Sequence, residues 1–181
     1  DSEPETAEKV VEDMSALFRA SLSDAENLVP LGQEISLCER YIHIEQLRLG
    51  DRLQVAWDKQ LQGDKYLVPS LCLQPLIENA IYHGIQPLVE GGTITIAVHD
   101  TGNRLSVCIS NPVSGEIANR KRGNGMALDN LEQRLRVRYG AAASFSVARE
   151  VETFTVSFSI PLETTTVSGQ IAASGQQGAT A

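Results

Sequence analysis

An amphipathic segment at residues 73–84, with the sequence LQPLIENAIYHG, most constrains what this chain can fold into. At about 100° per residue, its apolar side chains fall on one arc of a helix. The other side carries Glu78, Asn79 and His83, and contains no lysine or arginine. The pattern predicts a helix capped by Gly84. Two interpretations stay open from this segment alone: an ordinary core helix, or one wall of a polar site.

Composition excludes several classes of protein. A length of 181 residues suits one domain with a short extension, and a hydrophobic content of 42% suffices for a packed core. The formal charge of −8 opposes direct nucleic-acid binding by phosphate neutralisation. No apolar run is as long as a membrane span, and the first residues are unlike a signal peptide. Cys38, Cys72 and Cys108 are far apart in apolar surroundings, which predicts reduced core thiols rather than disulfides or a metal cluster.

The first fifty residues predict two amphipathic helices. Apolar residues recur at three- and four-residue spacing over residues 5–22 and again from Leu31 to Leu49. Their apolar surface is large for a lone hairpin, so we expect it to pack against another domain or a second subunit. His43, in the second helix, is interpreted as a packed or surface histidine.

Beyond Gly50 the apolar period changes to two, which predicts strands. They are expected at residues 53–57, 93–98, 105–109, 145–147 and 154–160, with a hairpin turn at 101–103. The helix at 73–84 is expected to begin near residues 68–70, with Pro75 in its first turn. Together these elements predict an α+β sandwich with helices on one face of a mainly antiparallel sheet. The expected divisions are a helical segment at 1–50, a domain at 51–162 and a disordered tail at 163–181.

Residues 111–125 lack periodicity and end in two glycines, Gly123 and Gly125, before a helix predicted at 126–139 with Gly140 as its stop. Glycines let the backbone approach a ligand closely, and the first amides of a helix point outward at the positive end of its dipole. Three consecutive basic residues precede them: Arg120, Lys121 and Arg122. The segment predicts a phosphate-binding loop, and the alternative is a flexible turn with a solvated basic run.

The two segments together predict a site for a nucleotide with Mg²⁺. Glu78 and Asn79 supply oxygen ligands of the kind that Mg²⁺ accepts, and this ion usually takes few protein ligands together with substrate phosphates. The glycine loop would hold those phosphates. The sequence contains no Walker loop, no protein-kinase signature set and no Rossmann fingerprint.

The same segments carry a resemblance to a known family. Residues 73–84 resemble the asparagine box of sensor histidine kinases of the LytS/YehU type, and residues 123–135 resemble their second glycine box. Residues 17–22, 29–34 and 41–48 also resemble linking segments of that family. The resemblance spans residues 5–162, and within the family it is nearest to the AlgZ/FimS subgroup.

The resemblance implies a Bergerat-type (GHKL) ATP-binding fold, a two-layer sandwich of a mixed sheet and helices, preceded by a helical linker and dimerisation segment. It implies ATP and Mg²⁺ as cofactors, with Asn79 as the metal ligand and Glu78 as the catalytic residue that polarises the attacking histidine. Its lid would close through Gly123 and Gly125. The implied nucleotide-binding set is Asn79, His83, Asn111, Lys121, Arg122, Gly123, Gly125 and Met126.

Two departures from the family pattern matter. The family has an Asp that accepts a hydrogen bond from the adenine amino group, and the alternation Val107, Ile109, Asn111 puts an asparagine there. An amide keeps one carbonyl acceptor but lacks the charge, so adenine recognition is expected to be weaker or assisted by water. The family's Asn-Pro-His-Phe phosphoacceptor motif is absent from this sequence. The chain is therefore expected to be unable to autophosphorylate alone.

The resemblance implies a kinase that transfers the γ-phosphoryl group of ATP to a histidine upstream of this chain, and thence to a response regulator that controls transcription. It implies a homodimer through the N-terminal helices and a cytoplasmic location, with membrane attachment only through a sensor region outside the chain. Two alternatives stay open. One is a degenerate module that acts as a regulator or scaffold, and the other is an ATPase or anti-sigma kinase, which the helical matches oppose.

Overall fold

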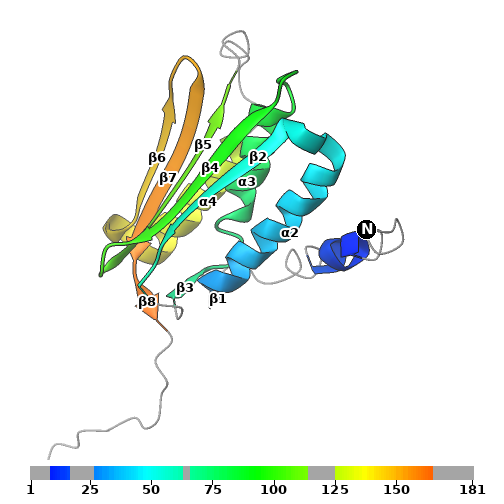
Figure 1. Ribbon diagram of the computed structural model, residues 1–181. Coiled ribbons are helices and arrows are strands. Elements are labelled where there is room, and N and C mark those ends of the chain that lie inside the picture. Colours follow the sequence, from blue (N-terminus) through cyan, green and yellow to red (C-terminus); the bar gives the residue numbers. More distant parts are fainter. Residues whose placement is uncertain (1–8, 17–26, 63–65, 114–124, 165–181) are drawn as a thin grey trace, which may run out of the picture.

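The computed structural model describes residues 9–16, 27–62, 66–113 and 125–164. Its main sheet and the helices that cover one face of it form two layers (Figure 1). The strands of this sheet are β2 (Leu53–Gln60), β4 (Gly92–Asp100), β5 (Arg104–Pro112), β6 (Ser144–Arg149) and β7 (Thr153–Pro161). The helices are α2 (Leu31–Leu49), α3 (Gln74–Asn79) and α4 (Gly125–Tyr139), with the short helical segments η1 (Gly50–Arg52), η2 (Ala80–Ile85) and η4 (Gly140–Ala142). This confirms the predicted α+β sandwich.

The sheet is mixed, with the spatial order β2-β4-β5-β7-β6. Strands β2 and β4 run parallel, and the other neighbours run antiparallel. In β4, Ile94, Ile96 and Val98 are fully buried, whereas Thr93 and Thr95 are exposed. The alternation that predicted this strand therefore also identifies the face that the helices cover.

A second, smaller sheet was missed in the sequence. Strands β1 (Leu28–Pro30), β3 (Tyr66–Pro69) and β8 (Glu163–Thr164) pair in the order β1-β3-β8. The prediction of a disordered tail from residue 163 is wrong for its first two residues, because Glu163 pairs with Leu67 of β3. Strands this short carry too few residues for alternation to be recognised. The rest of the tail lies outside the described residues.

The helix predictions differ in detail from the structure. Residues 9–16 are helical, in agreement with the helix predicted at 5–22, whose other residues are not described, and α2 begins and ends as predicted. The prediction that the third helix begins near residues 68–70 is wrong, because those residues end β3 and a turn delays α3 until Gln74. Pro75 does lie in the first turn.

Gly84 is not a helix cap, contrary to prediction. Helix α3 continues directly into η2, a π-helical segment that includes Gly84 and ends at Ile85. A Cβ atom at Gly84 would lie 2.2 Å from Nδ2 of Asn111, so the glycine is there to admit the end of β5. The predicted start of the loop at Asn111 is also wrong, because β5 extends to Pro112.

Two of the three cysteines match the prediction of core thiols, and Cys108 does not, because it lies on the face of β5 opposite to the buried Val107 and Ile109. Cys38 and Cys72 are fully buried free thiols whose pKa is raised by burial, and Cys108 is a half-buried free thiol. Among the described residues, no three His, Cys, Asp or Glu side chains are grouped as a metal site. No helix in the described ranges is both long and apolar enough to cross a membrane. The division at residues 50 and 162 stays a prediction.

Candidate functional site

The candidate site lies at the carboxyl end of the α3–η2 helical segment. Its apolar stripe, which includes Leu76, Ile77 and Ile81, is fully buried and fixes which side chains face the remaining directions. Asn79 is a polar residue that is nevertheless only 5% exposed. A buried amide is held in a defined orientation by its neighbours, as a metal ligand must be.

His83 lies one turn beyond Asn79. Its ring packs edge-on against Tyr82, with 4.7 Å between the ring centroids. Its Nε2 atom is buried and has no hydrogen-bond partner among the residues that the structure describes. An unpaired buried nitrogen of this kind is costly to leave unbonded, so it marks a place where a further polar group belongs.

Glu78 points in a different direction from Asn79. Its Oε1 accepts a hydrogen bond from Nε2 of Gln74, at 2.7 Å. Burial is the main cause of the raised pKa values of Tyr41 and Cys38 on α2, and the negative charge of Glu78 contributes to both. The predicted catalytic carboxylate therefore lies near α2, about 100° around the helix from Asn79.

Asn111 reaches the same region from the end of β5. Its side chain is 4% exposed, on the helix-covered face with Val107 and Ile109, as the alternation predicted. Its Nδ2 donates a hydrogen bond to the carbonyl of Pro112, at 2.8 Å, which leaves the amide oxygen to accept a bond from a ligand. Its contact with Gly84 places it directly against η2.

The amino end of α4 supplies the remaining described residues of the predicted site. Gly125 begins the helix, and Met126 is 84% exposed. Leu128 and Leu131 are buried and hold this end of α4 on the core. The other predicted loop residues, Lys121, Arg122 and Gly123, lie outside the described residues.

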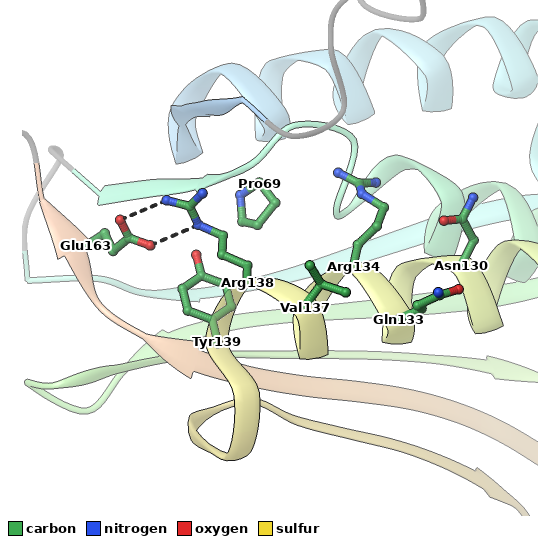
Figure 2. A pocket seen from close by; sticks show the side chains of 8 residues that line it. All are labelled: Pro69, Asn130, Gln133, Arg134, Val137, Arg138, Tyr139 and Glu163. Atoms are coloured by element: carbon green, nitrogen blue, oxygen red, sulfur yellow. Dashed lines mark hydrogen bonds and ion pairs between the residues drawn. The ribbon is translucent and has the colours of Figure 1, made fainter.

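Helix α4 packs beside α3, with Asn130 alongside it and Arg134 nearer its beginning (Figure 2). The part of α4 that precedes Asn130 thus extends toward the Asn79 end of α3. The structure therefore brings Asn79, His83 and Asn111 into one region, with the amino end of α4 directed to it. Glu78 borders this region on the side of α2.

Glu34 and Arg134 contribute to this region, and neither was assigned a role from the sequence. Glu34 of α2, only 2% exposed, accepts hydrogen bonds from the amides of Leu71, Cys72 and Leu73. Burial raises the pKa of Glu34, while these three bonds and the charge of Arg134 lower it. The signal for Glu34 was available: an acidic residue on the apolar side of an amphipathic helix is buried and needs partners.

A groove of about 700 Å³ lies beside the carboxyl half of α4 (Figure 2). Its charged side chains already have partners: Arg138 donates two hydrogen bonds of 3.2 Å to the carboxylate of Glu163, and Arg134 donates to backbone carbonyls. Burial also raises the pKa of Tyr139, beside them, to about 12. This groove is separate from the region around Asn79.

Comparison with known proteins identifies relatives. A family model described as "Histidine kinase" matches residues 1–53. The chain is 34% identical over 178 residues to the sensor histidine kinase YpdA of Escherichia coli (strain K12), covering 92% of this chain and 31% of YpdA. It is 33% identical over 149 residues to the sensor protein LytS of Oceanobacillus iheyensis, and the match covers 72% of this chain and 25% of LytS. The chain is homologous to the sensor histidine kinases.

Solved structures of histidine kinases share the fold. The catalytic domain of ThkA matches with a TM-score of 0.53 and 17% identity, over 75% of this chain and 95% of that domain. ShkA, solved at full length in complex with AMPPNP, matches with a TM-score of 0.54 and 18% identity, over 86% of this chain and 36% of ShkA. The predicted Bergerat-type fold is thus the fold of this histidine kinase homologue. The chain spans about a third or less of the length of YpdA and LytS, and the AlgZ/FimS placement stays a prediction.

Proposed function

We propose that this chain is the ATP-binding catalytic part of a histidine protein kinase. It binds Mg²⁺-ATP and transfers the γ-phosphoryl group to a histidine outside this chain, from which a response regulator receives it. The observation that carries the proposal is the buried Asn79, one turn from His83, whose Nε2 has no partner among the described residues, in a helical segment that meets the end of β5 at Gly84. Homology to sensor histidine kinases supports the same conclusion.

The residues present fit a magnesium nucleotide. The amide oxygen of Asn79 is a hard ligand, and Mg²⁺ needs few such ligands when phosphates complete its shell. The ion would neutralise charge on the phosphates during transfer. The orphaned nitrogen of His83 suits a bond with a phosphate oxygen, and the amides that begin α4 at Gly125 suit a second phosphate. Lys121, Arg122 and Gly123 stay predicted nucleotide-binding residues, and they lie outside the described part of the chain.

Glu78 has the position for a different task. Its carboxylate lies on the side of α2, and α2 belongs to the helical segment that the histidine kinase family model matches. A histidine presented from that side would meet Glu78, which would accept a hydrogen bond from the imidazole and orient its attacking nitrogen. Asn111 would accept the adenine amino group through its amide oxygen. A homodimer formed through the N-terminal helices would bring the acceptor histidine to this face.

Calorimetric titration of the chain with Mg²⁺-ADP tests the proposal. We expect a dissociation constant of about 1 mM or lower, which corresponds to at least about 4 kcal/mol of binding free energy. Asn79→Ala should weaken binding about tenfold or more, because the ion loses its amide ligand. Gln54→Ala, an exposed change on β2, serves as the control and should bind as the original chain does. An absence of binding heat and of thermal shift at high nucleotide concentration would refute the proposed function.

A further inference from the structure

The turn at residues 70–73, between β3 and α3, is strained and clamped from two sides. Leu71 has a φ angle of +55°, which is unfavourable for a residue with a side chain. The carbonyl of Leu73 accepts the first hydrogen bonds of α3, from the amides of Leu76 and Ile77. The geometry of this turn therefore sets the direction in which α3 leaves it, and α3 carries Asn79.

Glu34 holds the turn from α2. The amide of Leu71 donates to its Oε1 at 2.7 Å, and the amides of Cys72 and Leu73 donate to its Oε2 at 3.0 and 3.2 Å. Amides at the start of a helix have no partner within the helix. One buried carboxylate thus satisfies three consecutive donors, which no single neutral side chain of similar size can do.

Arg134 holds the same turn from α4. Its guanidinium donates hydrogen bonds to the carbonyls of Ser70 and Leu71, and its charge acts on Glu34. Figure 2 shows Arg134 pointing from α4 toward the ribbon that leads from β3 into α3. Glu34 therefore binds the amides of the turn and Arg134 its carbonyls, and the two residues come from different helices.

We propose that Glu34 and Arg134 are positioning residues for the nucleotide site. By clamping the turn from α2 and α4, they fix where α3 places Asn79 relative to the amino end of α4. The metal ligand and the phosphate-binding end of α4 then keep their spacing only while the clamp is intact. This inference rests on the proposed function. It adds that α2, which is part of the helical segment, is mechanically joined to the metal ligand.

The test uses Glu34→Gln in the full chain, with ADP affinity measured by calorimetry in the presence and absence of Mg²⁺. Glutamine keeps the size of the side chain but turns an NH₂ group toward amide donors. We expect the Mg²⁺-dependent gain in affinity to fall about tenfold, as for other residues that orient a metal ligand, while binding of ADP without Mg²⁺ changes little. The control is Val156→Ala, which creates a cavity beside β7 and so lowers stability away from the turn. It should keep the full Mg²⁺ dependence of ADP binding.

A second variant and a double-mutant cycle make the test decisive. Arg134→Met, which removes the clamp from the other side, should reproduce the loss if Glu34→Gln folds poorly. Adding Glu34→Gln to Asn79→Ala should weaken Mg²⁺-ADP binding no further, because both act through one ligand. Full Mg²⁺ dependence in both clamp variants, or additive losses in the cycle, would overturn this inference alone. Failure of the original chain to bind Mg²⁺-ADP would overturn the proposed function and this inference with it.

Discussion

At its amino end, the α3–η2 helical segment is held by three hydrogen bonds to Glu34 and by donated bonds from Arg134. At its carboxyl end, His83 keeps a buried nitrogen with no partner in the described part of the chain. Asn111 is packed so tightly against the same end that only a glycine fits at position 84. At the amino end the backbone amides and carbonyls of the turn are bonded to protein side chains, although Oε1 of Gln74 is buried there without a partner among the described residues. At the carboxyl end the group without a partner in the described residues is a ring nitrogen one turn beyond the buried Asn79.

This difference separates support from binding. Buried polar groups are almost always bonded in folded proteins, so an end whose backbone groups are bonded to buried side chains is stabilised and oriented by them. A buried group that is unbonded within the described residues takes its partner from a ligand, from an ordered water or from residues that the structure does not describe. Substitutions at the two ends should therefore differ in balance. At the amino end the loss of folding stability should be the larger effect, with Mg²⁺-dependent binding lost only through misplacement of Asn79. At the carboxyl end nucleotide binding should fall with a smaller loss of stability.

Glu34→Ala should give the largest effect. It leaves three amide donors without an acceptor and Arg134 without its counter-charge, in a site where Glu34 is 2% exposed. We expect the free energy of unfolding to fall by about 3–5 kcal/mol, a large part of the stability of an ordinary domain. Urea unfolding, monitored by circular dichroism, measures this loss in the free energy of unfolding.

Glu39→Ala on the same helix is the matched control. Glu39 is half-exposed and pairs with Lys59 at 2.8 Å on the surface. Exposed pairs of this kind contribute about 0–1 kcal/mol. Equal losses from the two alanine substitutions would contradict the view that the amino end of α3 is the supporting one.

Gly84→Ala should come next. The new Cβ would lie 2.2 Å from Nδ2 and 2.9 Å from Cβ of Asn111, so η2 and the end of β5 must move apart. We expect a loss of about 1–3 kcal/mol in stability, typical of overpacking, together with weaker Mg²⁺-ADP binding. Gly32→Ala in α2 meets no atom within 4 Å and should be neutral or slightly stabilising, with unchanged binding. Unchanged nucleotide affinity in Gly84→Ala would place the ligand elsewhere.

Asn111→Asp should lower stability less than Gly84→Ala does, and it should strengthen nucleotide binding rather than weaken it. A carboxylate cannot donate to the Pro112 carbonyl, so a bond of 2.8 Å is replaced by repulsion, and we expect a loss of about 1–2 kcal/mol. A charged acceptor should bind the adenine amino group more strongly. Thermal unfolding with and without Mg²⁺-ADP, and with Mg²⁺-GDP as the control, should show a lower melting temperature but a larger shift with ADP. A smaller ADP shift would show that residue 111 does not contact adenine.

Much of the fold could be predicted from periodicity, because strands such as β4 and β7 alternate over nine residues each. The sheet of β1, β3 and β8 could not, since its pairing depends on residues far apart in sequence. The end of the third helix was predicted at Gly84 because a glycine after an apolar stripe usually caps a helix. Here the same residue serves close packing against β5, which only the three-dimensional structure reveals.

The site divides in the same way. Asn79 and His83 could be found from helical spacing, because both lie on one short helix. The placement of Asn111 followed from alternation along β5. The clamp of Glu34 and Arg134 joins residues one hundred positions apart through backbone atoms of a third segment. Backbone partners leave no signature in side-chain patterns, so the sequence indicated a buried acid at most.

The supporting end extends back along β3 to Asp100, and the smallest effect is expected there. Asp100 accepts hydrogen bonds from the amide of Gln62, the hydroxyl of Tyr66 and the amide of Gly102. These bonds lower the pKa of Asp100 below its ordinary value of 3.8. The ionised form is thus favoured in the folded chain, so its contribution to stability is present above pH 3.8 and is lost as the pH falls through the lowered pKa.

Asp100→Asn should therefore lower the melting temperature modestly at pH 7, and the difference from the original chain should shrink as the pH falls toward about 2. Asp51→Asn, at an exposed position in η1, is the control and should show no such convergence. Because Asp100 holds Tyr66 of β3 and not the carboxyl end of η2, Mg²⁺-ADP affinity should stay unchanged. A difference in melting temperature that is constant with pH would mean that the carboxylate charge is not what these bonds recognise. A loss of affinity would mean that Asp100, which lies outside the clamp of Glu34 and Arg134, also positions the nucleotide site.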